Sequence, residues 1–137
     1  MKFADLTDFI KDFLQTEFPE LPIILEDKGD IEYEANNALA KQGVYMLIRF
    51  PQFVFQGISN DKLGLTATSM IIQISENVPV NRHKTEFITA NAYSFKVAKV
   101  VMDKLKNIVN LVDVYNDYVD GLMISTVNFE TTFNITD

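Results

Sequence analysis

The chain has 137 residues and a formal net charge of -7, with 47% hydrophobic and 23% charged residues, which is typical of a single folded domain. A pI near 4.6 excludes a general affinity for nucleic-acid backbones, because that affinity depends on Lys and Arg neutralising phosphates. The absence of Cys excludes disulfides, thiolate nucleophiles and thiolate metal sites.

The N-terminal region predicts a helix over residues 3–18, because apolar residues recur three and four positions apart and Pro19 follows. Asp5, Asp8 and Asp12 interrupt the apolar stretch that a signal peptide would need. No apolar run reaches the roughly 18 residues that span a bilayer. We therefore expect a soluble, unexported protein.

Residues 21–35 predict a short strand, a turn at residues 28–30 and a second short strand, followed by a loop or a single helical turn over residues 36–43. The predicted hairpin is acidic and carries five carboxylates: Glu26, Asp27, Asp30, Glu32 and Glu34. Strand alternation sends these side chains to different faces, and the EF-hand spacing is absent, so a metal site is disfavoured. A solvated acidic hairpin and an acidic surface that meets a basic partner both stay open.

The next segments predict strands. Residues 44–50 form the first, Pro51 interrupts it by a bulge or a bend, and the pattern resumes over residues 52–57 before a turn-rich stretch. Residues 66–76 form another, with Gln73 and Ser75 facing outward and three even positions facing the core: Met70, Ile72 and Ile74. The stretch FPQFVF either fills the core or lines a ligand pocket, and aromatic residues at strand spacing favour the core.

A second helix is expected from about Thr89 to Lys106, with its buried stripe at Ala92, Phe95, Ala98, Val101, Met102 and Leu105. Residues 108–119 are apolar but irregular, so their state stays open, and Asp120–Gly121 predicts a turn. Residues 122–136 predict a final strand. At about 3.3 Å per residue this strand is as long as the domain, so it either bends and bulges inside the sheet or overhangs and invites pairing with another chain.

This order of elements predicts one domain over residues 1–137 with an α+β fold: a mainly antiparallel sheet with two helices packed on one face.

No motif predicts a catalytic or cofactor site. His83 is the single His and falls in a predicted polar turn between Arg82 and Lys84, where positive neighbours lower its basicity. A nucleophile elbow, a phosphate-binding loop and a His-based zinc site are all missing from the sequence, and nothing selects a carboxylate pair for glycoside hydrolysis. We expect no enzymatic activity, no cofactor and no metal.

Charge is segregated along the chain. The basic trio Arg82, His83 and Lys84 stands inside an acidic chain, and the predicted hairpin over residues 26–34 is acidic. Two different complementary patches on one molecule favour head-to-tail contact, which closes into rings. The trio and the five carboxylates are therefore candidate contacts between subunits, and an ordinary solvated turn is the alternative for the trio.

The stretch IIQISENVPVNR (71–82), followed by a Lys-bearing helix and a closing strand, resembles tail terminator or tail-completion proteins of long-tailed bacteriophages. The similarity of element order covers nearly the whole chain.

The resemblance implies a non-enzymatic virion assembly protein that forms a ring, usually of six subunits, on the head-proximal end of the tail tube. Its implied partners are the tail tube protein and the head connector, and viral DNA would pass through the ring without specific binding. The implied location is the tail or neck of the virion, with assembly in the host cytoplasm. Another neck or tail structural protein is the nearest alternative.

A rival hypothesis is a monomeric module that binds an apolar ligand between the helices and the sheet. The eleven Phe residues are its support. It predicts a monomer with an internal pocket, whereas the assembly hypothesis predicts a homo-oligomer.

Overall fold

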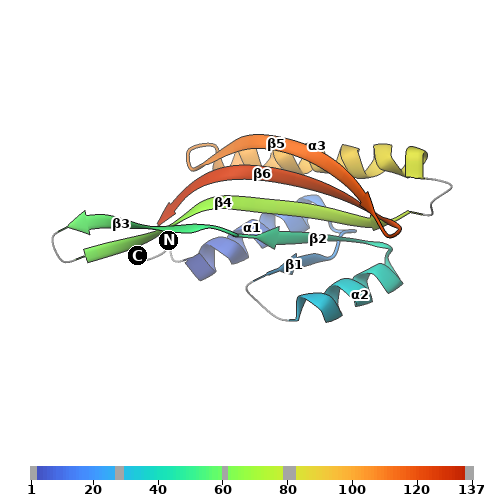
Figure 1. Ribbon diagram of the computed structural model, residues 1–137, viewed down its shortest axis with the longest axis horizontal. Coiled ribbons are helices and arrows are strands. Elements are labelled where there is room, and N and C mark those ends of the chain that lie inside the picture. The colour runs from blue at the N-terminus through green and yellow to red at the C-terminus, as the bar shows by residue number, and fades with distance from the viewer. Residues whose placement is uncertain (1–2, 27–29, 60–61, 79–82, 135–137) are drawn as a thin grey trace.

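The computed structural model contains both helices and strands (Figure 1) and describes residues 3–26, 30–59, 62–78 and 83–134. For residues 3–4, 55–59, 62–65, 83–91 and 132–134 only the backbone is described. The elements in this part of the chain are α1 (Phe3–Glu17), β1 (Ile23–Leu25), α2 (Ile31–Lys41), β2 (Val44–Arg49), β3 (Phe53–Ser59), β4 (Lys62–Asn77), α3 (His83–Leu105), β5 (Val109–Val119) and β6 (Leu122–Asn134).

The strands form one sheet in the order β1-β2-β4-β6-β5, and β3 also pairs with β4. Every described pair is antiparallel except β1 with β2. Strands β2 and β3 lie along different halves of β4, because Arg49 pairs with Ile71 and Phe53 pairs with Ala67. Pro51, which has no N–H to donate to a ladder, lies between the two strands. The α+β class and the mainly antiparallel sheet are confirmed.

One face of the sheet carries the main core. Helices α1 and α3 cover this face, and Ile10 and Leu14 of α1 and Val97 and Val101 of α3 are completely buried. The sheet contributes alternate positions, as expected, and those at most 1% exposed include Met46, Ile48, Met70, Ile72, Ile74, Val127 and Phe129. Aromatic and aliphatic side chains therefore fill the space between the helices and the sheet.

The second face of the sheet is covered at one margin by a helix that the sequence analysis missed. Residues predicted as a second strand and a loop form α2, which packs on β1 and β2 through Ala35, Ile24 and Leu47. Asp30 begins the helix, because its side chain accepts the backbone N–H of Tyr33 at 3.1 Å. The prediction of an acidic hairpin is therefore wrong. The two helices expected on one face of the sheet are present there, and α2 is a third helix on the opposite face.

Helix α3 begins at His83, earlier than expected, so His83 and Lys84 are helical and not part of a turn. The predicted stripe is correct toward the C-terminal end of α3, where Ala98, Val101 and Leu105 are buried and Met102 packs against the core. It is wrong nearer the N-terminal end, where Ala92 and Phe95 are exposed and Ser94 and Val97 are buried instead. Apolar residues surround most of this helix, so spacing alone does not fix which side faces the sheet.

Strand β5 covers the residues whose secondary structure the sequence left open. A two-residue turn joins β5 to β6. Asp120 and Gly121 both have positive φ, 50° and 81°, as a type I′ hairpin turn requires. This turn was predicted.

Strand β6 lies inside the sheet between β4 and β5, and its register shifts where Thr131 and Thr132 oppose Thr68. The bulged alternative for the final strand is thus correct through Asn134, and Ile135 and Thr136 lie outside the described residues. Strand β4, with 16 residues, is longer than β6, with 13.

Candidate interaction surface

The side of β4, β6 and β5 that faces away from α1 and α3 is not covered by α2. We call it the open face. By strand alternation it carries Ile71, Gln73, Asp113, Tyr115, Asp117, Ile124, Thr126, Asn128 and Glu130. Ser75 also lies on this side but is only 3% exposed, contrary to expectation, because its neighbours in register are the larger Tyr45 and Ile124.

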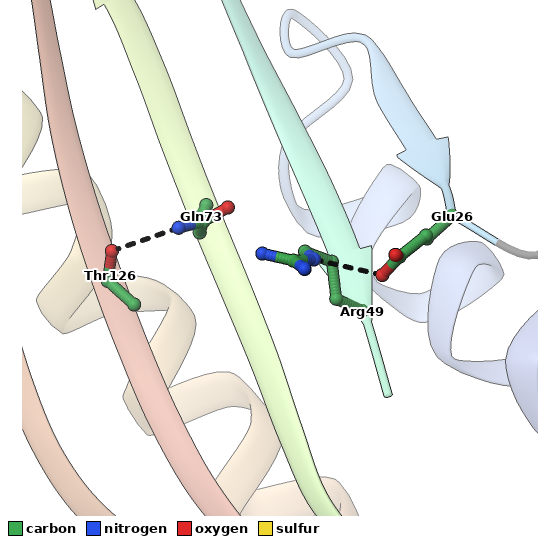
Figure 2. Close-up of polar contacts among 4 residues, drawn as sticks. All are labelled: Glu26, Arg49, Gln73 and Thr126. Atoms are coloured by element: carbon green, nitrogen blue, oxygen red, sulfur yellow. Dashed lines mark hydrogen bonds and ion pairs between the residues drawn. The ribbon is translucent and has the colours of Figure 1, made fainter. Parts of the chain in front are cut away.

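Polar side chains on this side form contacts across neighbouring strands. Gln73 Nε2 donates to Thr126 Oγ1 at 3.4 Å, and at the margin Arg49 Nε donates to Glu26 Oε2 at 2.9 Å. Figure 2 shows these four side chains with helix α3 behind the strands. A polar surface with satisfied side chains is stable in water, so this face does not need a hydrophobic cover.

The open face is acidic toward β5. Asp113, Asp117 and Glu130 are exposed there, and Asp113 Oδ1 accepts from Asn128 Nδ2 at 2.6 Å. Arg49 lies on β2, beside the open face and away from β5, and it is paired with Glu26. Negative charge is therefore concentrated on the β5 side of the open face.

A hollow of about 670 Å³ lies at the end of the open face, where β6 and β5 both shift register. Its floor includes Ile71, Ser69 and Asn128, and its rim carries the exposed side chains of Val54 on β3 and Val112 on β5. The hollow is on the surface of the sheet and not between the helices and the sheet, where the rival hypothesis expected a ligand.

A second hollow, of about 440 Å³, lies between the end of α1 and α3. Tyr93 contributes to it, and the Tyr93 hydroxyl donates to Glu20 Oε1 at 3.2 Å while the ring packs edge-on against Phe18. Burial raises the pKa of Tyr93, and the hydrogen bond and negative charge of Glu20 add to the increase. Lys96 Nζ lies 5.8 Å from the ring centroid. These contacts attach the end of α1 to α3.

The strand hairpin β3–β4 projects beyond the helices and beyond the ends of β5 and β6 (Figure 1). We call residues 53–59 and 62–67 the ribbon. Within the described residues, β3 pairs with β4 alone, and β6 pairs with the ribbon only at its base, at Thr66 and Ala67. No charged residue occurs between Arg49 and Asp61, so β3 is entirely uncharged in an acidic chain. That uncharged run is the sequence signal that would have indicated the ribbon.

Strand β5 forms the opposite edge of the sheet. Four of its apolar side chains are at least 43% exposed: Leu111, Val112, Tyr115 and Val119. Long edge strands with exposed apolar side chains are sites at which another strand can add to a sheet. The sequence analysis missed this surface, because it assigned no state to these residues.

The predicted acidic contacts are dispersed in the structure. Glu26 pairs with Arg49, and Asp30 caps α2, so both carboxylates are used inside the subunit. Glu32 and Glu34 are exposed in the first turn of α2. Asp27 lies outside the described residues.

Of the predicted basic trio, Arg82 lies outside the described residues, and His83 and Lys84 are described by backbone only, at the start of α3. The described residues therefore do not test whether the basic and acidic groups lie close together.

Comparison with known protein families and with curated proteins finds no match for this chain. In the part of the chain that the structure describes, no three His, Cys, Asp or Glu side chains gather as a metal site would require. No described helix is both long enough and apolar enough to cross a membrane. The features of the described residues that bear on function are therefore the two sheet edges, the ribbon and the open face.

Proposed function

We propose that this protein is a non-enzymatic assembly protein that joins copies of itself into a ring and acts as phage tail terminators do, capping the tail tube and joining it to the head connector. The observation that carries the proposal is the ribbon. It extends past the layers that bury the core, and its exposed side chains include Phe53 and Val54.

A two-stranded hairpin is at best marginally stable alone in water. The ribbon leaves the sheet with support from β6 only at its base, and apolar residues outnumber charged ones along it. An element of this kind becomes stable when another chain covers it, which supports self-association over a solitary monomer.

The open face supports a second part of the proposed function, the passage of DNA through the ring. Asp113, Asp117 and Glu130 give it negative charge, and each subunit adds a formal charge of -7. A ring that turned this face toward its channel would let DNA slide through without binding, because the phosphates would meet carboxylates and not Lys or Arg.

Charged contacts between subunits stay part of the proposal. Among the predicted acidic contacts that the structure describes, Glu32 and Glu34 are exposed and are proposed to meet Arg82, His83 and Lys84 of a neighbour. The proposed partners are the tail tube protein and the head connector, and the proposed location is the virion neck after assembly in the host cytoplasm.

The experiment is native mass spectrometry with negative-stain imaging of the purified protein at increasing concentration. We expect closed rings, with six subunits as the main species, and we expect the same rings at one end of added tail tubes. A monomer at every concentration, with or without tubes, contradicts the proposal. A monomer that also binds an apolar fluorescent probe would favour the ligand-binding alternative instead.

A further inference from the structure

The two edges of the sheet are complementary in direction. Strand β3 is antiparallel to β4, β4 to β6, and β6 to β5, so β3 and β5 run in opposite directions within one subunit. If a second copy stands beside the first with its strands pointing the same way, and is shifted along the strands until its β3 lies level with the β5 of the first copy, these two strands are antiparallel. Antiparallel pairing is the more stable arrangement per residue.

The two edges are also complementary in charge. On β5, Asp113 and Asp117 point to the open face, two positions either side of Tyr115. If two β5 edges paired about a two-fold axis at Tyr115, each Asp113 would lie directly opposite an Asp117, and such like-charge pairs destabilise a sheet. Strand β3 brings no charge, so β5 meets no repulsion from it.

The β3 edge and the β5 edge each contain a stretch of regular strand that can form a shared ladder. The register of β3 is unbroken over residues 53–57, and that of β5 is unbroken over residues 113–119. Val54 lines the hollow on the open face, and Tyr115 also faces that side. Directly opposed residues of an antiparallel pair point to the same face, so these two side chains can be neighbours across a shared ladder.

We infer that copies of this chain join by strand addition, with β3 of one subunit pairing antiparallel with β5 of the next. The inference rests on the proposed self-assembly and specifies its contact. The join is head-to-tail, and repetition by rotation closes it into a ring in which the open faces form a continuous surface.

Engineered disulfides test the contact, because the natural chain contains no Cys. Val54→Cys is combined in turn with Asp113→Cys, Tyr115→Cys or Asp117→Cys, which samples the registers that keep both residues on the open face. Under mild oxidation, we expect at least one of these double variants to give a ladder of linked oligomers on a non-reducing gel. Each single variant should stay unlinked, because a head-to-tail contact never places a residue beside its own copy.

The matched control is Val54→Cys with Asp12→Cys, which places the second thiol at an exposed position of α1, on the helix-covered side of the sheet and away from the β5 edge. Dimers from Tyr115→Cys alone, or from Val54→Cys alone, would show that like edges pair and would overturn the inference. Oligomers in native mass spectra without a cross-link in any double variant would also overturn it, and would leave the proposed function standing. If oligomers are absent altogether, the proposed function itself fails.

Discussion

Tyr93 is the residue whose ionisation the fold changes most clearly. Burial, the hydrogen bond to Glu20 and the negative charges of Glu20 and Glu76 raise the pKa of Tyr93 above its ordinary value of about 10. The folded state therefore favours the neutral phenol. This contribution to stability is complete below a pH of about 10 and is lost as the pH rises through the folded-state pKa.

We expect the free energy of unfolding to decrease as the pH is raised above about 10, and to decrease less steeply in Tyr93→Phe. Urea unfolding followed by circular dichroism at a series of alkaline pH values measures both slopes. Tyr33→Phe is the control for the removal of a phenol hydroxyl, because Tyr33 is 69% exposed. Equal slopes for the parent chain and Tyr93→Phe would show that this phenol has no such role.

Single residues were predicted well where one strand face is buried. Met70, Ile72 and Ile74 are fully buried, because a period of two has only one alternative phase and that phase would bury Gln73. Ser75 shows the limit of this reasoning, since its burial comes from side chains of β2 and β6, far away in sequence.

At the scale of elements, α2 shows how a short acidic segment can be assigned the wrong secondary structure from its sequence. Ile31, Tyr33 and Ala35 alternate as a strand would, and Ile31, Ala35 and Ala38 also follow helical spacing, so the apolar pattern fits both states. Asp30 decides in favour of the helix through its bond to the Tyr33 N–H.

We expect Asp30→Ala to lower the free energy of unfolding by about 1 kcal/mol, because the first turn of α2 loses its capping acceptor. Asp30→Ser should retain most of the stability, since a hydroxyl oxygen can accept the same bond. Urea unfolding of the two variants beside Glu32→Ala, which removes an exposed carboxylate without a capping role, provides the comparison. Equal losses in the Ala and Ser variants would mean that the cap does not hold this helix.

The candidate surface was less predictable than the elements, because edges are defined by pairing. The sequence indicated a turn at Asp120–Gly121 and strands on either side of Pro51, but not that β3 would lie beyond the helices. Which strand is outermost depends on β6 entering between β4 and β5, and that pairing joins residues from distant parts of the chain.

At the scale of the whole molecule, the net charge of -7 opposes the proposed self-association, so the proposed contact between subunits should not bring carboxylates opposite one another. Val54→Glu and Val54→Lys separate this charge effect from the loss of an apolar side chain. If β3 meets Asp113 and Asp117 of β5, the Glu variant should associate more weakly than the Lys variant, by up to about fivefold for each like-charge pair.

Sedimentation velocity at matched concentrations measures this ratio, with Phe95→Glu as the control because Phe95 is 57% exposed on α3, outside both edges. Equal association of the Glu and Lys variants would indicate that no carboxylate of a neighbour lies near β3.

The central position of β6 has a consequence for how the chain reaches its native state. Its partner β4 is synthesised well before it, and the ladder between them joins Asn77 to Leu122 at one end and Thr66 to Asn134 at the other. Local pairs such as the β5–β6 hairpin can form quickly, whereas closing the long loop that contains α3 is entropically costly and slow. Until β6 is inserted, one edge of β4 is bare, so a nascent chain of this protein is most prone to misassembly, and most dependent on chaperones, just before β6 is made.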